Sequence, residues 1–272
     1  MQDLSPAELI SAIEMNLASW IPVFGLLGRA YLNDPPGEKR SITGLPFSLF
    51  NSVMDARLAA DQTEAAIHAI VSDARARNVP VLWWIGPSSQ PADLGKRLED
   101  NGFVFDEDTP GMALDLERLN EGLPRLAGFS IQHAQDDAAW RQWSIVMETG
   151  FGASAPNELS INAWCSILRQ AEPETVLAYT GYLEDKPVAA SLLFLATGVA
   201  GVYCVATIPE ARRKGIGALM TEYPLSESHS MGYRIGVLES SAMGLGVYRS
   251  LGFQEYCKFV TYVWKPEKAS VG

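Results

Sequence analysis

The sequence predicts an α/β or α+β fold built from two similar units in tandem. Strand and helix patterns alternate along both halves of the 272-residue chain, as in proteins whose sheets are flanked by helices. The segment Leu119–Gly128 contains two glycines and a proline, and we interpret it as a linker between the halves. The order strand, helix, strand, helix, Gly-Phe occurs twice, at Gly102-Phe103 and at Gly252-Phe253, which indicates a duplicated unit. We therefore expect one domain at 1–120 and a second at 128–272.

Hydrophobic periodicity and turn residues predict the elements of the second half. A strand at Phe129–His133 leads into a helix over Asp136–Thr149, whose first residue is a favourable helix cap. A hairpin turn is expected at Glu184–Pro187. The remaining expected elements are a helix at Leu159–Gln170, strands at Val176–Leu183, Val188–Leu195 and Val199–Thr207, a helix from about Gly215, a strand at Arg234–Leu238, a helix around Gly246–Ser250 and a pair of strands within Phe253–Trp264.

The first half shows part of the same plan with weaker patterning. Its expected elements are a strand at Phe50–Met54, an amphipathic helix at Asp61–Arg77, a strand at Val79–Ile85, a helix carrying Leu94–Asp100 and a strand that ends within Gly111–Leu116. Trp83 and Trp84 form an aromatic cluster at one of these strand ends. Core packing is the simplest explanation for the cluster, and contact with a substrate or with another domain is the alternative.

Composition disfavours several classes of function. The chain has 21 Lys and Arg against 32 Asp and Glu, a net charge of −11, which argues against binding to nucleic acid or to an anionic membrane. The three cysteines are widely spaced, so they predict no disulfide framework and favour a reducing, cytoplasmic location. The three histidines lie far apart, and we expect no metal site. Met1–Ser11 has no basic residue, which argues against a secretory signal.

One uncharged stretch is long enough to cross a bilayer. Val188 to Pro209 contains 22 residues without a charge. Gly198 and Gly201 interrupt it, and β-branched and aromatic residues lie on both sides of them. Two buried strands joined by a tight turn therefore explain the stretch better than a membrane span does.

The most informative motif lies between a predicted strand and a predicted helix, at Val205–Gly217. It contains the spacing Arg212-x-x-Gly215-x-Gly217. A helix start offers free backbone N–H groups and a positive dipole end, and glycines let the backbone approach a diphosphate closely. The basic run 212–214 adds three positive charges. A nucleotide P-loop or a dinucleotide fingerprint would need residues that this segment lacks. A structural turn with an exposed basic face is the alternative.

This motif resembles the acetyl-CoA site of the GNAT superfamily of N-acetyltransferases, where Arg-x-x-Gly-x-Gly follows a strand that ends in Val-Ala-Thr-x-Pro-Glu. Downstream, Val247–Phe253 is similar to the closing helix and Leu-Gly-Phe turn of that family. The resemblance covers about half of the chain, from Phe129 to Trp264. It implies a mixed, strongly twisted sheet, splayed between the Val199–Thr207 and Arg234–Leu238 strands so that CoA can enter. With the duplication, it implies two tandem GNAT-like units.

The resemblance also assigns residues to acetyl-CoA. Backbone groups at the end of the Val199–Thr207 strand would bind the acetyl and pantetheine arm, and main-chain N–H groups from 212 to 218 would wrap the pyrophosphate. Ser241 stands where the family usually has a polar Asn, and it can still bond the CoA arm. The expected cofactor-binding residues are Val205, Ala206, Thr207, Arg212, Arg213, Lys214, Gly215, Ile216, Gly217, Ala218 and Ser241.

Tyr248 and Glu239 are the candidate catalytic residues. Tyr248 stands where the family has a tyrosine that protonates the departing CoA thiolate, a role that suits a phenol. A packed aromatic residue is the alternative explanation. Many family members carry a glutamate base on the strand that here reads Gly201–Val205, and this strand has Cys204 instead. Glu239, at the end of the next strand, is the candidate base, and a water chain is the alternative.

Some residues depart from the pattern of the family. Pro224 should kink or shorten the pyrophosphate-binding helix. In the first half no glycine occurs between Gly44 and Gly86, and Leu98 stands where the duplication would place a counterpart of Tyr248. We therefore expect the first half to be a degenerate copy that binds no CoA.

These features predict an N-acetyltransferase that transfers an acetyl group from acetyl-CoA to a primary amine by direct attack in a ternary complex. The acceptor would be a small-molecule amine or an exposed amino group. One alternative is a non-catalytic module that binds or senses acyl-CoA, and another is transfer of a different acyl group. The negative net charge argues against a charged tRNA as donor. A homodimer is a possible assembly.

Overall fold

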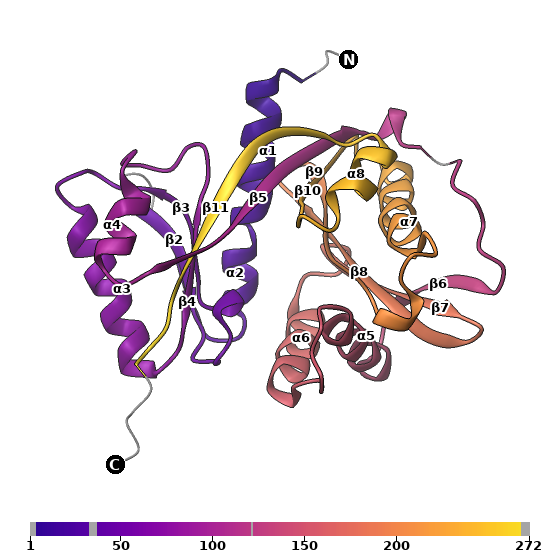
Figure 1. Ribbon diagram of the computed structural model, residues 1–272, viewed down its shortest axis with the longest axis horizontal. Helices are drawn as coiled ribbons and strands as arrows, with labels where there is room; N and C mark the ends of the chain where they lie inside the picture. Colours follow the sequence, from indigo (N-terminus) through magenta and orange to yellow (C-terminus); the bar gives the residue numbers. More distant parts are fainter. Residues whose placement is uncertain (1–3, 33–36, 121, 268–272) are drawn as a thin grey trace. The chain divides into compact units, whose positions relative to one another are not determined.

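The computed structural model describes residues 4–32, 37–120 and 122–267, and its chain divides into two compact units (Figure 1). Unit 1 is formed by Met1–Asn16 and Gly111–Tyr256, and unit 2 by Leu17–Pro110 and Cys257–Gly272. Glu121, which falls in the segment interpreted as a linker, lies outside the described residues.

The chain passes between the units within two long strands. These are β5 (Val104–Asp115) and β11 (Gln254–Trp264), and each has residues in both units. The units therefore differ from the expected domains at 1–120 and 128–272, because each unit takes in a segment from beyond the predicted linker.

Unit 1 contains a mixed sheet in the strand order β5-β10-β9-β8-β7-β6. Strands β9 and β10 are parallel, and the other neighbours are antiparallel. The remaining elements of the unit are α1 (Pro6–Ala18), the 3-10 helix η2 (Leu116–Arg118), β6 (Phe129–Ala134), α5 (Asp137–Gly150), α6 (Glu158–Gln170), β7 (Val176–Leu183), β8 (Lys186–Ala196), β9 (Val199–Thr207), η3 (Pro209–Ala211), α7 (Ile216–Ser230), β10 (Ile235–Glu239) and α8 (Leu245–Leu251).

Helices cover both faces of the unit 1 sheet (Figure 1). On one face, Trp143 of α5 donates from Nε1 to the carbonyl oxygen of Ser191 in β8, at 2.9 Å. On the other face, Ile216 and Met220 of α7 join the same buried cluster as Val202 of β9. Burial of these apolar side chains is the main force that holds the helices against the sheet.

Unit 2 has a sheet in the order β1-β2-β3-β4-β11. Strands β3 and β4 are parallel, and the other neighbours are antiparallel. Its core packs the apolar face of α3 against Trp83, which is fully buried. The elements are α2 (Trp20–Gly25), β1 (Arg29–Leu32), β2 (Gly37–Ile42), the 3-10 helix η1 (Ser48–Phe50), β3 (Ser52–Arg57), α3 (Thr63–Arg77), β4 (Val81–Ile85) and α4 (Leu94–Asp100).

The same order of elements occurs twice, as β3-α3-β4-α4-β5 and as β9-α7-β10-α8-β11. In each copy the first two strands are parallel neighbours, and a glycine with positive φ follows the last helix: Gly102 two residues after α4, and Gly252 directly after α8. The strand that follows the last helix joins the sheet of the other unit. Strand β5 pairs with β10, and β11 pairs with β4. The two copies have therefore exchanged their final strands.

Most expected elements are present within one to three residues of their predicted ends. The prediction of two strands within Phe253–Trp264 is wrong, because that segment forms the single strand β11. Of the two effects expected at Pro224, a kink or a shorter helix, shortening does not occur: α7 continues to Ser230, because the missing N–H removes only one bond of a helix that packs along much of its length.

The uncharged stretch Val188–Pro209 forms β8 and β9, joined by a tight turn at Thr197-Gly198, both with positive φ. Within the described residues, no helix has the length and apolar character that crossing a membrane requires.

Candidate functional site

The parallel strands β9 and β10 pair only near their amino ends. The register joins Ala200 to Gly236 and Gly201 to Val237, whereas β9 continues to Thr207 and β10 to Glu239. The hydrogen-bonded pairing therefore stops before the carboxyl ends of both strands. This is the separation that the resemblance implied between these two segments.

A bulge in β9 lies beside this separation. Ala190 and Leu192 of β8 oppose Ala206 and Tyr203, so β9 has one extra residue in the interval. Cys204 lies in the interval and has a φ of +53°, which is rare for a residue other than glycine. Such a bulge redirects side chains and interrupts the pairing of β9 with β8, which resumes at Ala206 and Thr207.

The loop between β9 and α7 leaves an open backbone surface. Arg213 and Gly215 both have positive φ, and Gly215 is the residue that precedes the helix. A Cβ added at Gly215 or at Gly217 would have no atom within 4 Å. The first N–H groups of a helix lack an acceptor within it, and the helix dipole is positive at this end. In α7 this applies to Ile216 and Gly217, because the N–H of Ala218 already donates to the carbonyl oxygen of Gly215 at 3.1 Å. The loop can therefore bind an anion through its backbone.

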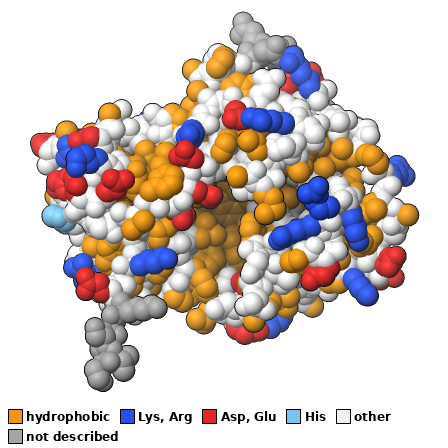
Figure 2. Space-filling model, in the orientation of Figure 1, with side chains coloured by type: hydrophobic (Ala, Val, Ile, Leu, Met, Phe, Trp, Pro, Cys, Tyr) orange, Lys and Arg blue, Asp and Glu red, His pale blue; other side chains and the backbone are white. Residues whose placement is uncertain are grey.

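Arg212 has a different position from its two basic neighbours. Its Nε donates to the carbonyl oxygen of Thr207 at 3.1 Å, and its Nη2 donates to that of Gly150 at 2.8 Å. The guanidinium thus joins β9, the loop and the last turn of α5. Arg213 and Lys214 are exposed. In Figure 2, several Lys and Arg side chains lie over the part of unit 1 that carries α7 and α8.

Tyr248 lies in α8 and is buried, with 9% of its surface exposed. Its ring packs edge to face on Phe253, and a Cβ at Gly244 would lie 2.6 Å from it. Burial, with a smaller contribution from Cys204, raises the pKa of Tyr248 to about 12. Tyr248 is therefore a neutral phenol at neutral pH, and its O–H is available to donate a hydrogen bond.

Glu239 is the last residue of β10. Burial raises the pKa of its carboxyl group to about 8, although hydrogen bonds from its own backbone N–H and from Tyr203 act in the opposite direction. Among the described residues, none donates a hydrogen bond to its buried Oε1. A carboxyl group with this pKa can exchange a proton near neutral pH, as a general base must.

Cys204 and Ser241 complete the expected set. Burial raises the pKa of the Cys204 thiol to about 12, so it is a neutral thiol rather than a nucleophilic thiolate. Ser241 is exposed, and its Oγ accepts from the N–H of Gly244 at 3.3 Å in the turn before α8. Val205 and Thr207 are half-buried at the end of β9, Ala206 is buried between them, and Ile216 and Ala218 lie in the first turn of α7.

The segment that leads into α3, the corresponding helix of unit 2, differs from this loop. Helix α3 begins after Gln62, without glycine, and Leu98 is fully buried in the core of unit 2. Trp83 is a fully buried core residue, as expected from the core-packing explanation of the aromatic cluster. Trp84 is half-buried and packs edge to face on Phe259.

Two residues near the site were not singled out from the sequence: Tyr203, which precedes Cys204 in β9, and Asn16, which contacts Tyr203. Asn16 lies in α1, and its Oδ1 is 2.7 Å from the hydroxyl of Tyr203. The start of α1 has a readable signal: Ser5 and Glu8 form a capping box, with Ser5 N–H donating to Glu8 Oε2 at 2.7 Å. The capping box predicts α1, but it does not indicate that Asn16 of this helix contacts Tyr203, which lies 187 positions further along the chain.

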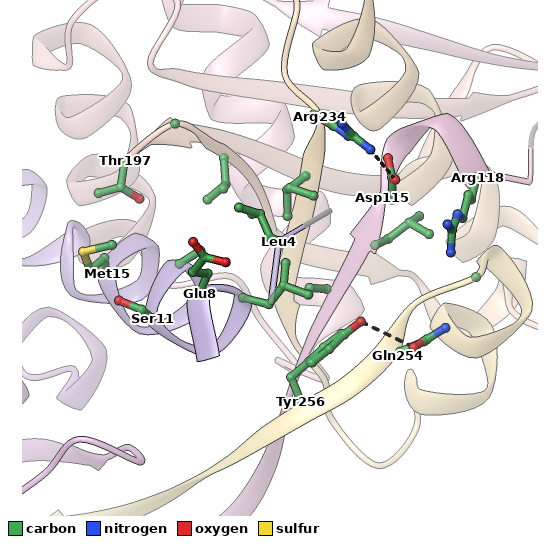
Figure 3. Close-up of a pocket in the computed structure, with 18 residues that line it drawn as sticks. Leu4, Glu8, Ser11, Met15, Asp115, Arg118, Thr197, Arg234, Gln254 and Tyr256 are labelled. Atoms are coloured by element: carbon green, nitrogen blue, oxygen red, sulfur yellow. Dashed lines mark hydrogen bonds and ion pairs between the residues drawn. The ribbon is translucent and has the colours of Figure 1, made fainter. Parts of the chain in front are cut away.

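A cavity of about 660 Å³ lies in unit 1 beside α1 (Figure 3). It is lined by α1, by Thr197–Val199, and by the amino end of β10, where Arg234 pairs with Asp115 at 3.2 Å. It lies at the opposite ends of β9 and β10 from the loop that precedes α7. Among the described residues, no group of three or more His, Cys, Asp or Glu side chains could hold a metal ion.

No protein-family model matches the sequence, and no curated protein matches it. Solved structures do. A GCN5-related N-acetyltransferase from Kribbella flavida is 18% identical, with a TM-score of 0.69 over 95% of this chain and 97% of that chain. One from Sphaerobacter thermophilus is 16% identical, with a TM-score of 0.61 over 97% and 94%. A tandem GNAT protein from the clavulanic acid biosynthesis pathway is 15% identical, with a TM-score of 0.58 over 81% and 76%. The chain thus has the fold of GCN5-related N-acetyltransferases, in a two-unit arrangement.

Proposed function

We propose that unit 1 binds acetyl-CoA at the β9–α7 loop and transfers its acetyl group to a primary amine. The observation that carries the proposal is the open surface at Gly215 and Gly217, at a helix start beside two parallel strands that separate. A pyrophosphate fits such a surface, because backbone N–H groups and the helix dipole both favour it. The fold shared with N-acetyltransferases supports acyl transfer in general.

In the proposed reaction the amine nitrogen attacks the thioester carbonyl carbon, and the carbon–sulfur bond breaks to release CoA. Glu239 in its carboxylate form takes the proton that the amine must lose. Backbone N–H groups of β9 stabilise the negative oxygen that forms during attack. Tyr248 donates a hydrogen bond to the departing sulfur.

The pKa of Tyr248 limits its part in the reaction. Full proton transfer from a phenol of pKa about 12 to a thiolate of pKa about 8.5 is unfavourable by roughly 3.5 pH units. A strong hydrogen bond to the thiolate costs much less, and a proton from water can follow. Tyr248→Phe should therefore lower kcat by roughly 10²-fold while leaving acetyl-CoA affinity nearly unchanged.

Calorimetric titration of acetyl-CoA into the full chain tests the proposal. Gly217→Asp places a carboxylate in the first turn of α7, where its side chain meets open space, and should weaken binding by roughly 10-fold or more. Ala65→Asp is the matched control, because Ala65 is exposed in the first turn of α3, the corresponding helix of unit 2. Binding at one site per chain, lost only in Gly217→Asp, supports the proposal.

Two other results of the titration would reject or change the proposal that unit 1 alone binds acetyl-CoA. No binding by the wild-type chain at millimolar acetyl-CoA rejects it. Two sites per chain would mean that the first half also binds CoA.

Thiol release is then measured with a panel of primary amines. Binding without turnover of any amine would favour a module that senses acyl-CoA, and turnover only with other acyl-CoA donors would favour a different acyl group.

A further inference from the structure

The cavity beside α1 is lined entirely by residues of unit 1, and the proposed acetyl transfer does not use it. Its volume of about 660 Å³ lies in the range of pockets that hold small organic ligands, about 300–1,000 Å³. One wall is a face of α1, on which Glu8, Ser11, Ala12 and Met15 have the spacing of neighbours on a helix. The remaining walls come from the ends of β5 and the starts of β9, β10 and β11.

Much of the lining is apolar. Leu9 of α1, Leu114 of β5 and Ile235 of β10 are buried side chains that line the cavity. Leu4 and Met15 line it as well, yet 41% and 44% of their surfaces are exposed. A ligand with an apolar body would remove that surface from water, which is favourable. The cavity therefore suits a ligand that carries an apolar chain.

Arg118 supplies a positive charge to the lining, from the end of the 3-10 helix η2. The backbone of η2 is held at its start, because the N–H of Leu116 donates to the carbonyl oxygen of Arg234 at 2.8 Å. Asp115 caps η2 by accepting from the N–H of Glu117 at 3.2 Å. Among the described residues, none accepts a hydrogen bond from the Arg118 guanidinium. A fixed backbone thus presents a guanidinium that can bind an anion.

Gln254 of β11 adds a second donor to the same side of the cavity. Its Oε1 accepts from the hydroxyl of Tyr256 at 3.4 Å, so its NH2 group remains to donate. Figure 3 shows Gln254 and Arg118 on one side of the cavity, whereas Ser11 and Met15 lie on the other side. A carboxylate has two accepting oxygens, and a guanidinium can bind both of them through parallel hydrogen bonds.

The other charged side chains of the lining favour a single negative charge on the ligand. They are Glu8, Asp115 and Arg234, and Arg234 is paired with Asp115 at 3.2 Å. The four charged side chains of the lining therefore sum to zero. A phosphate dianion would be repelled by both carboxylates, whereas a monoanion beside Arg118 keeps its distance from Glu8, which lies toward the other side in Figure 3.

We propose that this cavity binds a monocarboxylate with an apolar chain, of the size of a medium-chain fatty acid. Arg118 and Gln254 bind the carboxylate, and the chain lies along α1 toward Met15. This ligand site is separate from the one proposed for acetyl-CoA, and it stands whether or not unit 1 transfers an acetyl group.

The test is a calorimetric titration of octanoate into the full chain without acetyl-CoA. Saturable binding at one site per chain is expected. Arg118→Gln should weaken it by about 10-fold or more, because a charged partner of the carboxylate is lost. Arg125→Gln is the matched control, since Arg125 is exposed in the same unit and does not line the cavity. It should leave the dissociation constant unchanged.

A second pair of variants tests the place of the chain. Ser11→Trp puts a large side chain into the cavity and should abolish octanoate binding. Ala7→Trp is its control, because Ala7 is exposed on α1 and does not line the cavity. All four positions are exposed, so the variants should fold. Octanoate binding that is unchanged in either Arg118→Gln or Ser11→Trp rejects the inference.

Two ligands with the same chain test the head group. Octylamine should bind at least about 10-fold more weakly than octanoate, because Arg118 repels its positive charge. Equal affinity would show that the chain alone drives binding, and tighter binding of octyl phosphate would show that the site prefers a dianion. Either result rejects a monocarboxylate site, as does the lack of saturable octanoate binding at millimolar concentration. Acetyl-CoA titrated separately reports on the proposed function alone.

Discussion

Arg212 donates a hydrogen bond of 2.8 Å to the carbonyl oxygen of Gly150, the last residue of α5. The carbonyl groups in the last turn of a helix lack partners within the helix and lie at the negative end of its dipole. A guanidinium is a favourable partner for such a group. Arg212, the first basic residue of the loop motif, thus holds α5 against β9. The other two basic residues of the motif, Arg213 and Lys214, are exposed.

Arg212→Gln should lower the free energy of unfolding by about 1.5–3 kcal/mol, because two hydrogen bonds from a charged donor are lost. Arg213→Gln is the matched control: Arg213 is exposed in the same loop, so its loss should leave stability nearly unchanged and weaken acetyl-CoA binding slightly. Urea unfolding measures both variants. Equal stability of the two would show that the Arg212 contacts contribute little.

Gly201→Ala should destabilise unit 1 by about 1–3 kcal/mol, because the added Cβ overlaps Asn16 and Tyr203. Gly246→Ala is the comparison, since Gly246 lies in α8 with open space around its Cβ position. That change should stabilise the protein by about 0.5–1 kcal/mol through helix propensity. Chemical denaturation gives both values, and a neutral Gly201→Ala would mean that α1 shifts at little cost.

Stability should fall as pH rises through the range set by Glu239. Its pKa is raised from 4.5 to about 8 in the folded chain. Between these values the folded state holds a proton that the unfolded state has lost, so raising the pH favours unfolding. The contribution of Glu239 is complete below about pH 4.5 and lost above about pH 8. Thermal midpoints measured from pH 5 to 8 should decrease more in the wild type than in Glu239→Gln, and parallel curves would contradict the assignment.

Filling the cavity beside α1 should leave acetyl-CoA binding unchanged. Ser11 is exposed on α1 and lines the cavity (Figure 3), so Ser11→Trp places a large side chain there. The site proposed for acetyl-CoA lies at the other ends of β9 and β10. Calorimetry should give the same dissociation constant as the wild type. A tenfold weaker constant would instead place the ligand in the cavity.

The elements of unit 1 could be predicted because their patterns are local. The helix cap at Asp136, which accepts from the N–H of Ala139, and the glycines before α7 are each readable within a few residues. The partner of each long strand could not be predicted, because β5 and β11 have the same alternation whichever sheet they join. The contact between Asn16 and Tyr203 was equally hidden, since nothing near either residue in the sequence specifies the other.

The exchange of final strands has a consequence for folding. Strand β4 of unit 2 receives its neighbour from Val260–Trp264, with Ile85 opposite Val260, 175 positions along the chain. Strand β10 of unit 1 is paired with β5, and Ile235 lies opposite Asp115, 120 positions earlier in the chain. Pairings this distant close large loops and slow folding. Each sheet is therefore completed only after both halves have been synthesised, and cutting the chain in the 119–128 segment should yield fragments that regain structure only when mixed.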